Sequence, residues 1–193
     1  MTPRPRAGVL VAALQLVAAS ATAQLAEVQL GATASYGTGM AAQPGAGVVA
    51  GGAWGRLTYT GLRWTYHATA TTTQGPAASP TEVRNSFQVF ALDLGVLIPV
   101  DELEVVPELS IGVARFAQHS RPVAGGTESA DYGTELLAAP GVAVEVHALR
   151  LVFVPEVQYY FVGKPDLPWL VQHHGLVGSL RLVIPFEVRR IRL

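Results

Sequence analysis

Apolar and polar residues alternate along most of the chain with a period of two, which is the pattern of a half-buried β-strand. The stretch from 88 to 98 shows it well, because large apolar side chains occupy every second position: Phe90, Leu92, Leu94, Val96 and Ile98. The positions between them carry small or polar residues, including Ala91, Asp93 and Gly95. Glycine and β-branched residues are frequent, and no capping box precedes an apolar stripe, so strands are favoured over helices.

Eight segments carry this alternation and predict eight strands, at residues 25–36, 46–54, 57–70, 85–98, 103–117, 132–146, 149–161 and 172–188. Tight connections follow the second, fourth and sixth strands, around 55–56, 99–102 and 147–148. Longer connections, rich in residues that form turns, follow the other strands, at 37–45, 71–84, 118–131 and 162–171. An antiparallel up-and-down order would place all tight turns at one end of the sheet and all long loops at the other.

The composition indicates what surrounds this sheet. Half of the 193 residues are hydrophobic and 14% are charged, and the mean hydropathy of +0.33 is high for a soluble domain. Beyond the N-terminus no apolar run reaches the roughly 20 residues of a membrane helix, whereas strands of about 9–11 residues suffice to cross a bilayer. Since lipid tolerates no unpaired sheet edge, the predicted fold is a closed eight-stranded antiparallel transmembrane β-barrel with its bulky apolar face toward lipid.

Other classes of protein are excluded by the same counts. The 13 basic residues are balanced by 14 acidic ones, so the chain is not a basic nucleic-acid binder. The absence of cysteine excludes a disulfide scaffold and any metal site with thiolate ligands.

The first 23 residues have the pattern of a secretory signal rather than of part of the fold. Arg4 and Arg6 form a positive n-region, residues 7–19 are a short apolar stretch, and Ala21-Thr22-Ala23 suits signal peptidase. An uncleaved membrane anchor is the weaker interpretation, because the apolar stretch has only about 13 residues. The predicted organisation is therefore a signal peptide at 1–23 and a barrel domain at 24–193.

The small and polar face of the strands would line the interior of the barrel. Isolated charges on this face must find partners of opposite sign, because an unpaired buried charge is strongly unfavourable. The predicted interior charge network comprises Glu27, Asp93, Glu108, Glu145, Glu156, Arg63 and Arg181. Arg115 and Arg150 are further candidate partners for the carboxylates.

Aromatic residues concentrate near strand ends, which is typical of the two aromatic girdles of a membrane barrel. One group lies near the long loops: Trp64, Tyr66, Phe87, Phe116, Tyr132, Tyr159, Tyr160 and Phe161. A second group lies near the tight turns: Trp54, Tyr59 and Phe186. Together they are predicted to mark both membrane interfaces.

Four prolines fall inside predicted strands, at Pro107, Pro140, Pro155 and Pro185. Proline removes a donor from the hydrogen-bond ladder, and a closed barrel has no edge strand to receive it. Bulges or strand starts are therefore expected at these four sites. The repeated Pro-Glu pairs at 107–108 and 155–156 predict that Glu108 and Glu156 lie at similar depth.

This combination of signal, alternating strands, tight turns and longer loops resembles the small eight-stranded outer-membrane barrels of the OmpA/OmpX type. The resemblance implies location in a bacterial outer membrane, a monomeric barrel in contact with outer-membrane lipid, and insertion by the barrel assembly machinery. Such barrels commonly end in an aromatic residue, whereas this chain ends in Leu193 with Phe186 as its last aromatic residue.

No catalytic residue, cofactor or metal site is predicted. His173 and His174 are adjacent on an expected strand start and would point to opposite faces, which makes a poor chelate. His119 and Ser120 would diverge for the same reason, with Glu128, Asp131 and Glu135 as conceivable acids. His147 is expected to be exposed in a tight turn.

The favoured hypothesis is a non-enzymatic barrel with a packed, charge-paired interior that acts in envelope integrity or surface interaction through its long loops. A narrow channel or transporter for small or hydrophobic solutes is the main alternative. A lipid-acting barrel enzyme and a soluble periplasmic barrel that binds an apolar ligand are the remaining ones.

Overall fold

The computed structural model describes residues 25–54, 57–148 and 150–187. The expected signal peptide at 1–23 and the terminal Leu193 lie outside these residues. The elements in chain order are β1 (Leu25–Gly37), a 3-10 helix η1 (Gly39–Ala41), β2 (Gly45–Trp54), β3 (Thr58–Gln74), β4 (Thr81–Val96), β5 (Ile98–Val100), β6 (Leu103–Pro122), β7 (Ser129–Ala148), β8 (Leu151–Val162) and β9 (His174–Glu187). None of the described helical segments has the length and apolar character needed to cross a membrane.

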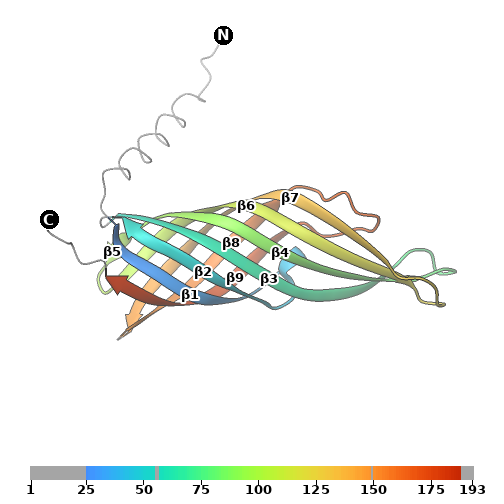
Figure 1. Ribbon diagram of the computed structural model, residues 1–193, viewed down its shortest axis with the longest axis horizontal. Coiled ribbons are helices and arrows are strands. Elements are labelled where there is room, and N and C mark those ends of the chain that lie inside the picture. Colours follow the sequence, from blue (N-terminus) through green and yellow to red (C-terminus); the bar gives the residue numbers. More distant parts are fainter. Residues whose placement is uncertain (1–24, 55–56, 149, 188–193) are drawn as a thin grey trace, which may run out of the picture.

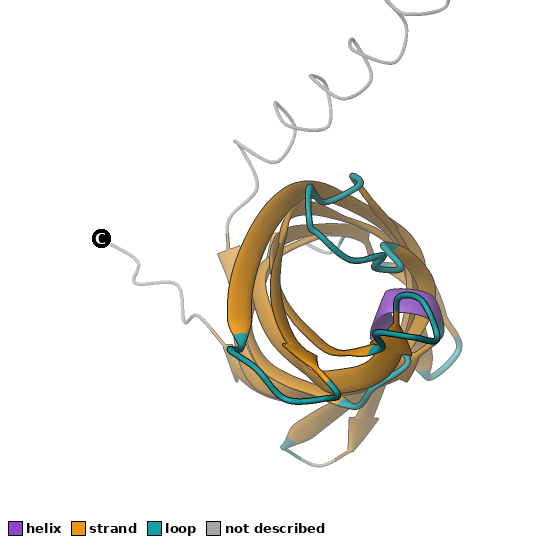
Figure 2. Cartoon of the chain, turned by 90° about the vertical axis from the view of Figure 1, so that its right-hand side faces the viewer, coloured by secondary structure: helices purple, strands orange, loops and turns teal. Residues whose placement is uncertain are grey.

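The strands close into an antiparallel barrel (Figures 1 and 2). Each strand pairs with its neighbours in sequence, and β1 pairs with β9 from Glu27–Glu187 to Gly37–Val177. The short β5 continues β4 after Leu97, since both pair with β6 in one unbroken register. The two therefore act as one barrel strand, and the predicted closed eight-stranded barrel is confirmed.

The two ends of the barrel differ, as the pattern of connections predicted. The turn end holds the tight β2–β3, β5–β6 and β7–β8 connections, together with both ends of the described chain (Figure 1). The loop end holds the long connections. Two of these were expected as loops at 71–84 and 118–131, but most of each is strand: β3 and β4 pair up to Gln74–Thr81, and β6 and β7 pair up to Ser120–Ser129. Threonines 71–73 are β-branched and favour this extension.

The outward face of the wall is apolar. Leu30, Leu92 and Leu182 are 50%, 42% and 40% exposed, whereas Arg181 and Glu145 on the inner face are each 4% exposed. A soluble barrel would show the reverse pattern. With about 3.3 Å per residue and a tilt of about 45°, the 12 residues of β8 cover roughly 28 Å, close to the ~30 Å hydrocarbon thickness of a bilayer.

Side chains fill the interior in layers. An apolar cluster near the loop end contains Met40, Phe87, Val89, Ala91, Ala114, Phe116, Leu137, Ala139, Tyr160, Val162 and Val177. A second apolar cluster near the turn end contains Val49, Tyr59, Leu97, Val106, Ala143, Val152, Val154 and Val183. Charged and polar side chains occupy the level between the two clusters.

The expectation of bulges at the four prolines was wrong. Ladder pairs run through Pro107 and Pro185 without a shift, and the β8–β9 ladder likewise includes Pro155. In the β7–β8 ladder the pairs that would contain Pro140 and Pro155 are missing, yet the register is the same on both sides. Each proline thus removes one hydrogen-bond donor, and the ladder pairs on either side of it keep the strand in register. Register shifts occur elsewhere, at Leu25/Glu27 and at His67/Ala70.

Candidate functional site

Five strands bring charged side chains to the middle of the barrel interior. The residues are Arg63 on β3, Asp93 on β4, Glu108 on β6, Glu156 on β8 and Arg181 on β9. All five are at least nine-tenths buried. The inward position of each residue follows from strand alternation, because every second residue of its strand points into the barrel. These five residues are called the charge network below.

Arg63 is the centre of the network. Its Nε and Nη2 donate to Asp93 Oδ2 at 3.0 and 2.9 Å, and its Nη2 also donates to Glu156 Oε2 at 3.0 Å. Its Nη1 donates to Glu156 Oε1 and, at 3.2 Å, to Gln158 Oε1. One guanidinium therefore links β3 to β4 beside it and to β8 across the barrel.

Arg181 completes the network from the opposite wall. Its Nη2 donates to Glu108 Oε2 at 3.0 Å, and its Nε lies 2.9 Å from Glu156 Oε2. The guanidinium also faces the ring of Tyr59, with its carbon 5.7 Å from the ring centroid, which is a cation–π distance. The two arginines thus share Glu156 and tie β8 and β9 to β3, β4 and β6.

Two neutral side chains that form hydrogen bonds with the charge network were not predicted. Gln158 Nε2 donates to Glu108 Oε1 at 2.9 Å and to Ser110 Oγ at 2.8 Å. Ser110 Oγ in turn donates to Asp93 Oδ1 at 2.6 Å. The sequence carried the signal for both, because each lies two residues beyond a network carboxylate on the same face of its strand.

Not all the candidate charges meet in the network. Glu27 and Glu145 are on the inner face but nearer the turn end, where Glu27 accepts a hydrogen bond from Gln29 at 2.9 Å and Glu145 lies 4.0 Å from His147. Arg115 and Arg150 are exposed, so they pair with none of the interior carboxylates. Arg115 instead lies over the ring of Tyr132 at 5.6 Å.

The charge network links strands on different sides of the barrel interior. Two guanidiniums face three carboxylates, so the network has a formal charge of minus one when all five groups are ionised. Ion pairs of this kind are strong only when their hydrogen bonds are satisfied, as those of Arg63 are. The network side chains lie in the interior between the two apolar clusters.

The structure divides the residues predicted for the aromatic girdle into two groups. Trp64, Tyr66, Tyr159 and Phe186 lie on the outward face and are exposed, and Trp54 is partly buried with its Nε1 donating to Thr60 at 2.7 Å. The prediction was wrong for a second group, whose residues are 2–5% exposed and have the inward phase: Tyr59, Phe87, Phe116 and Tyr160. Tyr132 and Phe161 are exposed, as a girdle requires.

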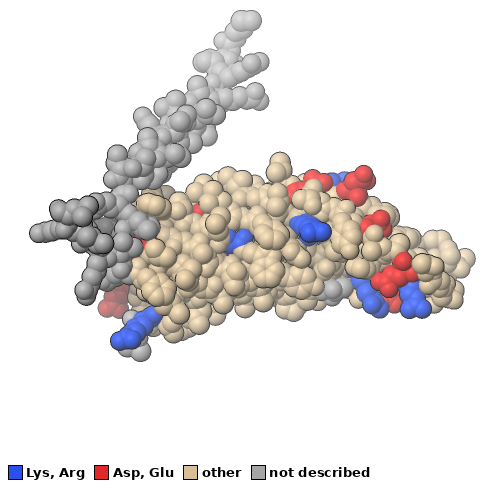
Figure 3. All heavy atoms as spheres, viewed as in Figure 1, with Lys and Arg blue, Asp and Glu red and all other residues tan. Residues whose placement is uncertain are grey.

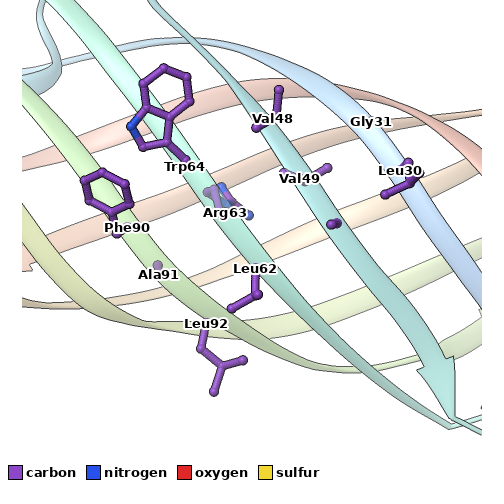
Figure 4. A pocket seen from close by; sticks show the side chains of 11 residues that line it. Leu30, Gly31, Val48, Val49, Leu62, Arg63, Trp64, Phe90, Ala91 and Leu92 are labelled. Atoms are coloured by element: carbon purple, nitrogen blue, oxygen red, sulfur yellow. The ribbon is translucent and has the colours of Figure 1, made fainter.

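The lipid-facing wall is hollowed where β1 to β4 pass side by side. A groove of about 680 Å³ is lined on the outside by Leu30, Val48, Leu62, Trp64, Phe90 and Leu92 (Figure 4). Arg63 emerges from the same strand as Leu62 and Trp64 but projects to the opposite side of the wall. The view shows how the alternation separates the charged interior from the apolar exterior.

On the face drawn in Figure 3, most charged side chains lie at the loop end, and the middle of the wall carries only a few basic atoms. Glu82 accepts a hydrogen bond from Arg84 Nε at 2.8 Å, which raises the pKa of the exposed Arg84. Two glutamines hold the 163–173 loop. The Gln74 side chain donates to the Leu170 carbonyl at 3.0 Å and accepts from the Leu170 amide at 3.2 Å. The Gln118 side chain donates to the Trp169 carbonyl at 3.2 Å and accepts from the Trp169 amide at 3.0 Å.

The two histidine motifs behave differently from each other. His119 lies 3.2 Å from Glu128, but Ser120 points inward and pairs with Ser129 at 2.8 Å, so no Ser-His-acid arrangement forms among them. The rings of His173 and His174 are 4.2 Å apart, contrary to the expected divergence, because His173 precedes the strand. His147 is half exposed as expected, although it lies in β7 and not in a turn.

No protein-family model matches this sequence, and no curated protein matches it. Solved structures do. The N-terminal β-barrel domain of Pseudomonas aeruginosa OprF is similar with a TM-score of 0.52 and 10% identity, over 84% of this chain and 98% of that one. A major outer membrane protein from Thermus thermophilus is similar with a TM-score of 0.65 and 12% identity, over 84% of this chain and all of that one. The chain thus has the fold of the small eight-stranded outer-membrane β-barrels.

Proposed function

We propose that this protein is a non-enzymatic outer-membrane barrel with a closed interior, which serves envelope integrity or surface interaction through its loop end. The observation that carries the proposal is the layered interior. Two apolar clusters enclose the charge network, so a hydrated ion would have to displace packed side chains at three successive levels. Eight-stranded barrels have room for side chains but little for an aqueous path.

The apolar wall and the similar solved structures support placement in an outer membrane. In this proposal the loop end faces the exterior of the cell and the turn end faces the periplasm. The partners are outer-membrane lipid around the wall and the barrel assembly machinery during insertion. Phe186, exposed on β9, would then be the aromatic residue closest to the end of the chain that contacts lipid.

Orientation and location are tested with short epitope insertions in intact cells. Gly125 lies in the 123–128 loop with no atom within 4 Å of an added side chain, so an insertion there should be tolerated. An antibody should bind this insertion on intact cells. The matched insertion between Asp101 and Glu102, in a tight turn at the opposite end, should become accessible only after permeabilisation. Equal accessibility of both sites would contradict the proposal.

A narrow channel is the second candidate, and one observation favours it. The hydroxyl oxygens of Thr33 and Ser179 are buried on the inner wall without a hydrogen-bond partner among the described residues, and internal water could satisfy them. Planar bilayer recording distinguishes the two. A closed interior predicts no discrete conductance, whereas reproducible steps that change in an Arg63→Ala variant would establish the channel.

A further inference from the structure

Three potential metal ligands meet on the inner wall at the turn end. Glu104 of β6 is the direct ladder partner of Glu145 of β7, and His147 follows two residues later on the same face of β7. One ligand atom from each of the three side chains lies within 4.8 Å of the others. This cluster is separate from the charge network and plays no part in the proposed function.

Glu145 is the unusual member of the cluster. Its side chain is 5% exposed, it makes no hydrogen bond with the described residues, and the basic atom paired with it is His147 Nε2 at 4.0 Å. Glu108 and Glu156 are buried to a similar degree, but both have close guanidinium partners. A buried carboxylate without such a partner is unfavourable, and a second carboxylate directly opposite on the ladder makes it more so.

Arg181 of the charge network also attracts Glu145, but it pairs directly with Glu108 and Glu156 and makes no ion pair with Glu145 within 4 Å. The other surroundings supply little compensation. On the adjacent strand β8 the inward residues at this level are Val152 and Val154, and the next inward residue of β6 is Val106. Glu27, on the inner face of β1 at the same end, adds negative charge. A bound cation would remove the repulsion between Glu104 and Glu145 and would satisfy the buried carboxylate at the same time.

We propose that Glu104, Glu145 and His147 bind one divalent transition-metal ion, of which Zn²⁺ is the representative. An imidazole nitrogen combined with carboxylate oxygens suits zinc and its neighbours, whereas Mg²⁺ and Ca²⁺ prefer oxygen ligands alone. Ligand distances of about 2.0–2.2 Å require the three groups to approach by small side-chain rotations from their present separation. His147 is half exposed, so an ion can enter from the solution at the turn end.

The ion would join β6 to β7 at the turn end. Because a metal that binds only the folded state stabilises it, zinc should raise the temperature at which the barrel unfolds. With three protein ligands, one coordination position would remain for water. The role assigned here is therefore a clamp at the turn end that also sequesters a metal ion.

The test uses the untagged mature chain, refolded in a non-ionic detergent, freed of metal with a chelator and titrated with Zn²⁺ by calorimetry. Saturable binding of one ion per chain is expected. Glu145→Gln and His147→Ala should each lower the affinity at least tenfold, because even indirect partners of a metal ligand contribute about 10–100-fold. Mg²⁺ at the same concentrations should not compete.

Two histidine variants are the matched controls. His119→Ala removes a partly exposed histidine that pairs with a carboxylate at the loop end, and His173→Ala disrupts the adjacent histidine rings. Both should bind zinc as the parent does. A gel-mobility shift on boiling verifies that each variant is a folded barrel; if Glu145→Gln fails to fold, the half-exposed His147 carries the test through His147→Ala and His147→Asn.

The proposal is overturned by any of three outcomes. The first is the absence of saturable zinc binding to the parent chain. The second is binding that His147→Ala retains and His173→Ala abolishes, which would place the ion at the loop end. The third is equal displacement by Mg²⁺, which would indicate only a general attraction of cations to carboxylates.

Discussion

Replacing Arg63 with methionine should be among the most damaging single substitutions in the barrel. Methionine has a similar length and keeps the packing of the aliphatic stem, but it removes every hydrogen bond that the guanidinium donates to Asp93, Glu156 and Gln158. Three buried carboxylates would then face Arg181 alone. The variant leaves negative charge inside the protein without compensation.

The expected loss follows from measurements on buried ion pairs. Removing one partner of a buried pair lowers the free energy of unfolding by about 3–5 kcal/mol. Since about 1.4 kcal/mol corresponds to a factor of ten, the ratio of folded to unfolded protein should fall by roughly two to four orders of magnitude. For a chain of this size the midpoint of thermal unfolding should fall by about 6–20 °C.

Urea unfolding in detergent, followed by tryptophan fluorescence, measures the free energy, and the shift in gel mobility on boiling measures the thermal midpoint. Arg115→Met is the matched control. Arg115 is exposed on the outer face, and its one interaction described above is with the ring of Tyr132. Its stability should equal or exceed that of the parent. Arg63→Met combined with Glu156→Gln should recover part of the loss, because it removes one uncompensated charge.

Two outcomes would refute this reasoning. A loss of less than about 1 kcal/mol in Arg63→Met would mean that the interior is hydrated enough to screen the charges, as at a protein surface. A double variant no more stable than Arg63→Met would mean that the loss comes from packing and not from charge.

Two further predictions concern the wall and the loop end. Leu92→Arg should lower the stability of the barrel in lipid vesicles by about 2–4 kcal/mol, because Leu92 faces lipid near the middle of the wall, whereas Val123→Arg in an aqueous loop should change it by less than about 0.5 kcal/mol. Urea unfolding in vesicles measures the stability of both variants. Equal stability of the two variants would contradict a lipid-facing wall. Gln118→Ala should increase hydrogen exchange at the Trp169 amide about fivefold, since one hydrogen bond contributes roughly 1 kcal/mol, and leave the ladder amide of Val177 unchanged. Unchanged exchange at Trp169 would show that the loop is held by other contacts.

The alternation of apolar and polar residues along a strand predicts which side chains point into the barrel and which point outward. Once the phase of a strand is known, Arg63, Asp93 and Glu156 must point inward. The same rule also applies to the aromatic residues that were misplaced: Tyr59 shares the phase of Arg63, Phe87 that of Asp93, and Tyr160 that of Glu156. These residues lie near strand ends, but the phase of a residue, and not its distance from the end of the strand, determines which side of the wall it faces.

Depth along the barrel axis is harder to predict from one sequence. Glu145 has the inward phase of its strand, but it lies below the charge network because neighbouring strands are staggered in a tilted barrel. The level at which two strands meet depends on their register, as in the pairing of Glu104 with Glu145. The length of a hairpin also depends on pairing between strands. The parts of β3 and β4 nearest the loop end are strands because they pair with each other.

Substitutions in the interior and on the outer wall should respond differently to the medium around the barrel. This difference is expected of a membrane barrel and not of a soluble barrel of the same shape. The charge network is shielded by two apolar clusters, so the effect of Arg63→Met should be similar in detergent and in lipid vesicles. The effect of Leu92→Arg depends on the hydrocarbon around the wall, and it should be smaller in detergent, where water and head groups reach the side chain more easily. If both variants responded alike to the change of medium, the separation between a sealed polar interior and a lipid-facing exterior would not hold.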